Sequence, residues 1–292
     1  MTKVETRSPP LKVAPATVPG TVSAVQRLWW DLRTMGLLWW REMVRLRHNP
    51  LRLVMGLVTP LLFVVVLGTG LDAASGLGKV ELHSYRAYLF PGALIMAVQA
   101  PAIAVGISIV WDRRVGLLRQ MLIAPLRRSS IVLGLALGGA TTAGVYGIMV
   151  LAVAGVASIS YSPALLLVLL EVLLIGLMFT AIGLVAAMTI RSVDTFQVVV
   201  SLSLLPLLFF SGAMFPPNGL PGWLSIIVKS NPLTYAVDAI RRTLPGDVTL
   251  GTNQTRLMLS GWVPPVLLEL CVPLCLAAIA LAVASHRFSR AE

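Results

Sequence analysis

Six long apolar segments constrain the fold of this 292-residue chain more than any other feature of its sequence. A helix needs about 20 apolar residues to cross a hydrocarbon core of roughly 30 Å, and each segment is long enough. Lipid offers no hydrogen-bond partners to the backbone, so such segments must be helical, and the alternating pattern of a membrane barrel is absent. We therefore predict an all-α integral membrane protein with six transmembrane helices. The predicted spans are residues 53–71, 89–110, 131–157, 164–190, 196–215 and 262–284.

The composition excludes several other classes of protein. Hydrophobic residues make up 57% of the chain and charged residues 12%, against roughly 25% charged residues in soluble domains. This excludes an ordinary soluble enzyme and a disordered chain, which needs low hydrophobicity. The net charge is +11, but a nucleic-acid binder would carry such charge on a mostly polar chain. We expect no nucleic-acid partner.

The distribution of the basic residues predicts the orientation of the chain. With the amino terminus inside, 17 of the 23 lysines and arginines fall in inside segments and six in outside segments. The positive-inside rule therefore places both termini in the cytoplasm, which agrees with an even number of spans.

Two different regions precede the first span. Residues 1–21 form a flexible basic tail rich in proline, and residues 22–50 have an apolar stripe at helical spacing. Tryptophans beside the stripe favour the lipid headgroup layer, so we predict an amphipathic helix on the inner membrane surface, ended by Asn49 and Pro50. A soluble helix packed on a partner is the alternative. Residues 51–286 would form the transmembrane domain and residues 287–292 a cytoplasmic tail. The stripe consists of Leu28, Leu32, Met35, Trp39, Met43 and Leu46.

The sequence contains no recognisable catalytic motif. The nearest approach to a Walker A loop is Gly78-Lys79, but Ala73 stands where the upstream glycine is needed. Neither G-x-S-x-G nor H-E-x-x-H occurs, and the three histidines are far apart. We therefore predict no catalytic, cofactor-binding or metal-binding residue on this chain.

The loop between the second and third predicted spans is short and densely charged. Within it, Leu117, Leu118, Met121 and Leu122 form a small apolar face at helical spacing, and Pro125 ends the turn. Such an element offers a compact surface to a soluble partner. Alternatively, the loop only sets topology through its arginines.

The segment after the fifth predicted span is broken by Pro216, Pro217 and Pro221. The apolar stretch 222–228 that follows is too short to cross the membrane, so it predicts a re-entrant or interfacial helix on the outer side. A further helix begins at Pro232. In that helix, Asp238 can pair with Arg241 or Arg242.

These two segments, on a six-span frame, resemble the membrane subunits of type-2 ABC exporters, in particular the daunorubicin-resistance and nodulation-type permeases. The resemblance covers roughly residues 29–287. The loop is similar to the family element G-[TL]-L-x-x-[LM]-x-x-x-P at Gly116, Leu117, Leu118, Met121 and Pro125. The outer segment is similar to the signature S-G-x-x-[FY]-P…L-P-x-W…N-P-[LF]-T-Y…D-x-[IL]-R. The matching residues are Ser211, Gly212, Phe215, Pro216, Leu220, Pro221, Trp223, Asn231, Pro232, Leu233, Thr234, Tyr235, Asp238, Ile240 and Arg241.

The resemblance implies specific partners and a location. The chain would be a multi-pass permease of a prokaryotic inner membrane that binds two cytoplasmic ABC ATPase subunits, on which ATP and Mg²⁺ act. It would pair with a second permease, as a homodimer or as a heterodimer with a similar subunit. Residues 22–49 would be the connecting helix.

The resemblance also assigns residues to a coupling site and to an outer gate. One departure is that many relatives carry Glu near Arg113 and Arg119, so the groove of the matching ATPase is expected to be more acidic. The residues implied in ATPase coupling are Asp112, Arg113, Arg114, Gly116, Leu117, Leu118, Arg119, Met121, Leu122 and Pro125. Those implied in the external re-entrant gate are Ser211, Gly212, Phe215, Pro216, Pro221, Trp223, Asn231, Pro232, Tyr235, Asp238 and Arg241.

Two carboxylates, Glu171 and Glu269, lie inside predicted spans. A charge at the centre of a membrane helix costs about 2.5–3.5 kcal/mol on translocon-insertion scales, so such residues are usually paired or functional. They would either face a cavity and engage substrate or make structural hydrogen bonds, for example to Arg241 or Arg242. A small-residue stripe in the third span, Gly134, Gly138 and Thr142, predicts close helix packing within the chain.

Taken together, the residues and the resemblance predict an ATP-driven exporter of an amphipathic, lipid-linked or drug-like substrate, because the spans offer few ionisable groups. An ion-coupled secondary transporter is the first alternative and would use Glu171 and Glu269 as a proton relay. An integral-membrane lipid-modifying enzyme is the second, and it would need clustered His, Asp or Glu residues at one membrane face.

Overall fold

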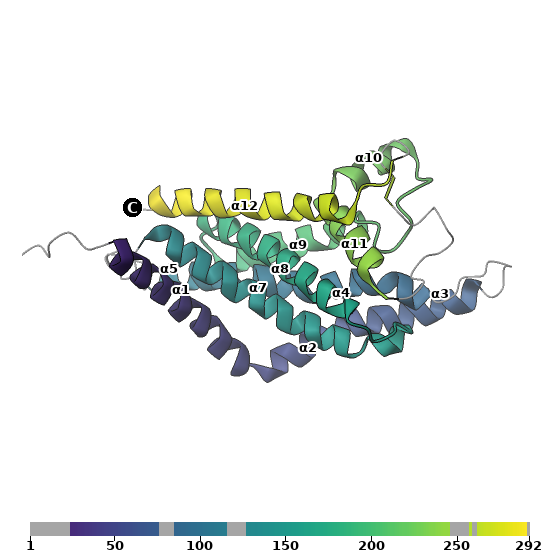
Figure 1. Cartoon of the computed structure of the whole chain (residues 1–292), viewed down its shortest axis with the longest axis horizontal. Helices are drawn as coiled ribbons and strands as arrows, with labels where there is room; N and C mark the ends of the chain where they lie inside the picture. Colours follow the sequence, from purple (N-terminus) through teal and green to yellow (C-terminus); the bar gives the residue numbers. More distant parts are fainter. Residues whose placement is uncertain (1–23, 76–84, 116–126, 246–256, 259–261, 291–292) are drawn as a thin grey trace, which may run out of the picture.

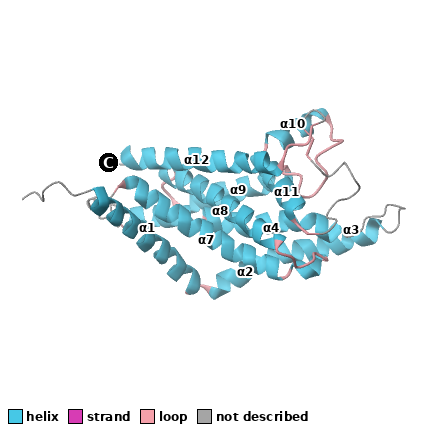
Figure 2. Ribbon diagram, viewed as in Figure 1, coloured by secondary structure: helices cyan, strands magenta, loops and turns pink. Residues whose placement is uncertain are grey.

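The structure is a computed structural model that describes residues 24–75, 85–115, 127–245, 257–258 and 262–290. Its regular elements within these ranges are helices (Figure 1, Figure 2). The helices before residue 115 are α1 (Ala24–Arg47), α2 (Pro50–Leu62), the π-helical turn η1 (Phe63–Leu67), α3 (Gly68–Ser75), α4 (Tyr85–Ile103) and α5 (Val105–Arg114). The later ones are α7 (Arg128–Ala152), the 3₁₀ turn η2 (Ala154–Ala157), α8 (Ala164–Thr189), α9 (Val193–Phe209), α10 (Gly222–Ser230), α11 (Pro232–Thr243) and α12 (Val266–Arg290).

Five helical stretches in the described residues are long and apolar enough to cross a membrane, which confirms an all-helical, multi-span chain. They are Pro50–Leu71, Tyr85–Arg114, Arg128–Ala152, Ala164–Thr189 and Val266–Phe288. The predicted span 196–215 corresponds to the shorter helix α9, which has 17 residues. The expected end of this span at residue 215 is wrong, because the backbone turns at Gly212 with a φ of +69°.

Prolines explain the interruptions in the first two spans. Pro60 lies inside α2 and is followed at once by the π-helical turn η1, since proline lacks the N–H that continues the helical ladder. Pro101 lies near the end of α4, and Ala104 separates α4 from α5. Each span nevertheless continues in one general direction (Figure 1).

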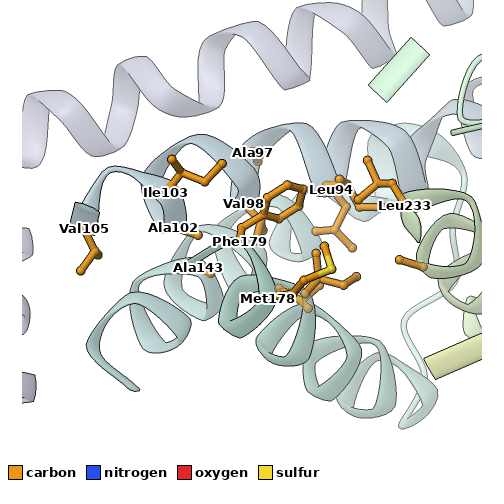
Figure 3. Packing of buried hydrophobic residues seen from close by; sticks show 14 of the residues in the cluster. Leu94, Ala97, Val98, Ala102, Ile103, Val105, Ala143, Met178, Phe179 and Leu233 are labelled. Atoms are coloured by element: carbon orange, nitrogen blue, oxygen red, sulfur yellow. The ribbon is translucent and has the colours of Figure 1, made fainter. Parts of the chain in front are cut away.

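The core of the bundle is formed by α4, α7 and α8. In the most apolar parts of the spans, 72% of residues are buried for α4–α5 and for α7, but only 22% for α2–α3 and for α12. Phe179 and Met178 of α8 pack among Leu94 and Val98 of α4 and Ala143 of α7 (Figure 3). Small residues permit this close approach, which supplies much of the packing between membrane helices.

Helix α1 lies along α7, and the small-residue stripe of α7 receives it (Figure 1). A Cβ atom at Gly134 would lie 2.9 Å from the Cα of Met35, and one at Gly138 would lie 2.9 Å from the Cγ of Glu42. The stripe therefore packs within the chain, as predicted.

The face of α1 that meets α7 includes only part of the predicted apolar stripe, since Met35 and Trp39 contact α7. Thr34, Leu38 and Glu42 are buried, whereas Leu28 and Leu32 of the stripe are exposed. One face of α1 therefore packs against α7, and another, apolar face is exposed.

Candidate coupling and gating regions

Both ends of the predicted coupling loop are bonded to α1. On α5, Asp112 accepts a hydrogen bond of 2.9 Å from Nη1 of Arg41. On the other side of the loop, Asp31 lies 3.5 Å from Nε of Arg127 and accepts a hydrogen bond of 2.9 Å from Oγ of Ser130. The Arg41–Asp112 pair is largely shielded from water, so it is screened less than a surface ion pair. These contacts join α1, the end of α5 and the start of α7 into one unit.

A second charged group reinforces this unit from inside. Glu42 is only 5% exposed, and its carboxylate lies 3.3 Å from Nη2 of Arg41 and 3.5 Å from Nη1 of Arg45. Trp39 donates a hydrogen bond of 3.0 Å from its indole nitrogen to Oγ1 of Thr141. A buried carboxylate is stable only when cations or donors surround it, so Glu42 holds the arginines of α1 in place against α7.

The structure describes only part of the predicted coupling set. Asp112 is partly buried and ion-paired, Arg113 places Nη2 3.9 Å from Sδ of Met188, and Arg114 is exposed. The remaining predicted coupling residues lie outside the described residues. They are Gly116, Leu117, Leu118, Arg119, Met121, Leu122 and Pro125.

At the opposite end of the bundle, the turn after α9 is held by residues of α4 and α11. The carbonyl of Gly212 accepts hydrogen bonds from the hydroxyl of Tyr88 at 3.2 Å and from Nη2 of Arg241 at 3.1 Å. The guanidinium carbon of Arg241 also lies 4.1 Å from the centre of the Tyr88 ring, a favourable cation–π distance. Nearby, Tyr85 donates a hydrogen bond of 2.7 Å to the carbonyl of Met214.

The Asn231-Pro232 motif joins α9, α10 and α11. Asn231 caps α11 by accepting a hydrogen bond of 2.9 Å from the amide of Leu233, while its Nδ2 donates to the carbonyl of Leu207 at 2.7 Å. Pro232 occupies the first turn of α11, where its missing N–H costs nothing. Tyr235 then bonds back to the carbonyl of Lys229 at 2.9 Å. The motif therefore connects the end of α9 and the short helices α10 and α11, and we call residues 229–235 the Asn231 joint.

The other predicted gate residues divide into buried and exposed groups. Ser211 is buried and donates a hydrogen bond of 2.6 Å to the carbonyl of Leu208. Phe215 and Pro216 are partly buried, whereas Pro221 and Trp223 are exposed. The 66% exposure of Trp223 leaves an aromatic ring on the outer surface of α10.

The two carboxylates in the spans have different partners. Glu269 is fully buried and accepts a hydrogen bond of 3.0 Å from Nη1 of Arg242. The same nitrogen donates to the carbonyl of Pro264 at 2.6 Å and lies 4.0 Å from Asp238. Glu171 instead accepts a hydrogen bond of 2.6 Å from the hydroxyl of Thr243.

Several contributing residues were not identified from the sequence. Glu42, Tyr85, Tyr88 and Thr243 each bond to residues at least 29 positions away or to a neighbouring arginine. The one available signal was the position of the two tyrosines at the beginning of a span, where aromatic residues are enriched.

Comparisons with known proteins agree with this architecture. The profile of the ABC-2 type transporter family matches residues 33–244. The Nodulation protein J of Rhizobium leguminosarum bv. trifolii is 31% identical over 211 residues, which cover 71% of this chain and 80% of that protein. The Daunorubicin resistance ABC transporter permease protein DrrB1 of Streptomyces coeruleorubidus is 27% identical over 215 residues, covering 71% and 73%. The probable doxorubicin resistance ABC transporter permease protein DrrC of Mycobacterium tuberculosis is 26% identical over 283 residues, covering 94% and 97%.

Five described helical stretches are long and apolar enough to cross a membrane, as expected for the transmembrane subunit of a transporter. The chain belongs to the ABC-2 type transporter family, as the matched residues 33–244 show. It is therefore a permease, and the permeases of this family work with ABC ATPase subunits. The predicted family resemblance is confirmed.

Proposed function

We propose that the chain is the permease of an ATP-driven exporter that moves an amphipathic, lipid-linked or drug-like substrate out of the cytoplasm. In this proposal the chain crosses the inner membrane of a prokaryote six times, with both termini inside and α9 as the fifth span. It pairs with a second permease, most simply a second copy, and with two ATPase subunits. The relatives named for nodulation and for daunorubicin and doxorubicin resistance support the exporter assignment.

The observation that carries the proposal is the attachment of both ends of the coupling loop to α1. Arg41–Asp112 joins α1 to α5, and Asp31 with Arg127 and Ser130 joins α1 to α7. A movement imposed on the loop by an ATPase would therefore displace α5, α7 and α1 together. ATP binding can shift the permease between two states only by differential contact with them, and this unit supplies a surface for such contact.

At the other end, α10 and α11 would form the outer gate. The Asn231 joint and the Arg241–Gly212 hydrogen bond hold these short helices against α9 and α4. When the gate opens or closes, α10 and α11 would move together, because hydrogen bonds of 2.9 Å link the residues around Asn231 to both helices. Of the two carboxylates that a proton relay would need, Glu269 is paired with Arg242.

The proposal is tested by transport in proteoliposomes that contain the permease and the ABC ATPase that co-purifies with it. A panel of drugs, glycolipids and polysaccharide precursors identifies the cargo, and vanadate sensitivity reports ATP dependence. We expect Arg41→Gln and Asp112→Asn each to lower the amount transported per ATP hydrolysed. The double variant should be no worse than Arg41→Gln alone, because Arg41→Gln already removes the interaction with Asp112 together with the one with Glu42.

Arg47→Gln provides the matched control, since Arg47 is an exposed arginine on the same helix. It should leave transport per ATP unchanged. Full transport in the absence of any ATPase would overturn the exporter assignment. Additive losses in the double variant would leave the exporter in place but remove the Arg41–Asp112 pair from the coupling route.

A further inference from the structure

A groove runs between α7, α8 and α12 on the surface of the bundle. Its volume is about 480 Å³, within the roughly 300–1,000 Å³ range of small-molecule sites. The groove is almost entirely apolar. Leucines from all three helices form its walls, among them Leu137, Leu170, Leu174, Leu177, Leu270 and Leu274.

One carboxylate interrupts this apolar lining. Glu171 is only 5% exposed, and its Oε1 accepts the hydrogen bond from Thr243. Its Oε2 is buried and has no hydrogen-bond partner in the described part of the chain. The other polar group of the groove, the hydroxyl of Thr141, already donates to the carbonyl of Leu137 and accepts from the indole of Trp39. A residue that lines the groove, Glu171, therefore carries one carboxylate oxygen without a hydrogen-bond partner in the described part of the chain.

The second carboxylate of the spans shows what Glu171 lacks. Glu269 is paired with the guanidinium of Arg242, whose Nη1 also donates to the carbonyl of Pro264. Within the described residues, no lysine or arginine forms an ion pair with Glu171. A buried carboxylate with one oxygen unpaired is costly in an apolar medium, so a cation from outside the chain would be bound favourably there.

We propose that this groove binds an amphipathic amine, with its ammonium group on Oε2 of Glu171 and its apolar chain along the leucines. Glu171 lies roughly 10 Å along α8 from Ala164, and Leu177 lies roughly 9 Å further along the same helix. The site thus has a polar end and an apolar extension of the length of a short alkyl chain. An ammonium satisfies the acceptor better than a hydroxyl, because charge-assisted hydrogen bonds are about twice as strong as neutral ones. This site is a property of the permease alone and does not depend on whether the chain exports.

The test uses the full chain in nanodiscs of zwitterionic phosphatidylcholine, which has no net charge. The probe is dodecylamine carrying a photoreactive diazirine in its alkyl chain, and the corresponding dodecanol is the neutral comparison. We expect saturable labelling of peptides from α7, α8 and α12 by the amine. Glu171→Gln should weaken this labelling by at least about tenfold, because a neutral amide replaces an ionic hydrogen bond. Labelling by the alcohol should be weak in both proteins.

A second pair of variants tests the groove without touching the carboxylate. Leu274→Trp places a larger side chain in the groove and should abolish the saturable labelling. Ile279→Trp makes the same kind of change at an exposed position on another side of α12 and should have no effect. Equal saturable amine labelling of the wild type and Glu171→Gln would overturn the proposal, as would equal affinity for the amine and the alcohol. Should Glu171→Gln fail to fold, persistence of amine labelling in Leu274→Trp would overturn it.

Discussion

Arg242 joins α11 to the beginning of α12. Its guanidinium nitrogen Nη1 contacts the carboxylate of Glu269 at 3.0 Å and the carbonyl of Pro264 at 2.6 Å, and it lies 4.0 Å from Asp238. Both oxygens of Asp238 are buried without a hydrogen-bond donor among the described residues. Arg242 is therefore a cation shared by two buried acids.

Removing this cation is expected to destabilise the chain strongly. Arg242→Met should lower the free energy of unfolding by about 3–5 kcal/mol, because Glu269 and Asp238 would be left as uncompensated buried charges. The measurement is denaturant unfolding of the purified chain in detergent. The double variant Arg242→Met/Glu269→Gln should recover part of the loss. The control Arg114→Met removes an exposed arginine and should change the free energy of unfolding by less than about 0.5 kcal/mol. Equal losses of stability in Arg242→Met and Arg114→Met would refute the role of Arg242 in compensating the buried acids.

At the scale of elements, the packing of α1 on α7 depends on two glycines of α7. Gly134 faces the backbone of Met35, and Gly138 faces the side chain of Glu42. The polar residues Thr34 and Glu42 are buried on this face of α1. α1 is thus fixed to the bundle by close approach and by charge, and its exposed apolar residues Leu28, Leu32 and Leu37 remain available to lipid or to a partner.

Two glycine-to-alanine substitutions on facing helices test this packing. Gly134→Ala should destabilise the chain by about 1–3 kcal/mol, because the new methyl group would collide with the backbone of Met35. Hydrogen exchange measured by mass spectrometry should show faster exchange confined mainly to α1. Gly36→Ala is the control, since nothing lies within 4 Å of a Cβ at that position. It should be neutral or stabilising by up to about 1 kcal/mol, as alanine favours helix. Unchanged exchange in α1 of Gly134→Ala would contradict the packing role.

At the scale of the whole molecule, the charged unit of α1, α5 and α7 and the α10–α11 joint lie at opposite ends of the bundle (Figure 1). The carboxyl-terminal end of α12 lies at the α1 end, where Arg128 donates a hydrogen bond of 3.1 Å to the carbonyl of Phe288. This arrangement is what a permease requires if force arrives at one membrane face and the substrate leaves at the other.

Single-cysteine variants test which end of the bundle lies on the cytoplasmic side of the membrane. After Cys271 and Cys275, both exposed on α12, are replaced by alanine, Ser230→Cys and Val115→Cys each introduce one exposed thiol. A membrane-impermeant maleimide should label Ser230→Cys on intact cells but Val115→Cys only after permeabilisation. The reason is that 17 of the 23 basic residues lie on the side predicted to be cytoplasmic. The reverse labelling pattern would invert the predicted topology.

The sequence by itself determined the features that depend on local pattern. Runs of apolar residues predicted the five long apolar helices, and the Asn231-Pro232 pair predicted the start of α11, because each follows from neighbouring residues alone. The sidedness of the spans stays a prediction from charge. Even here the end of α9 was missed, since the turn at Gly212 is held by Tyr88 and Arg241 from other helices.

Only the tertiary structure decided which partners are contacted by residues that occupy similar positions in the sequence pattern. Glu171 and Glu269 are both single acids in apolar spans, yet one faces an apolar groove and the other is bound to Arg242. Likewise, the face of α1 that packs on α7 includes the polar residues Thr34 and Glu42, although exposed apolar residues lie elsewhere on the same helix. Such differences arise from contacts between residues far apart in the chain. A helical period states which residues share a face, but not which helix that face will meet.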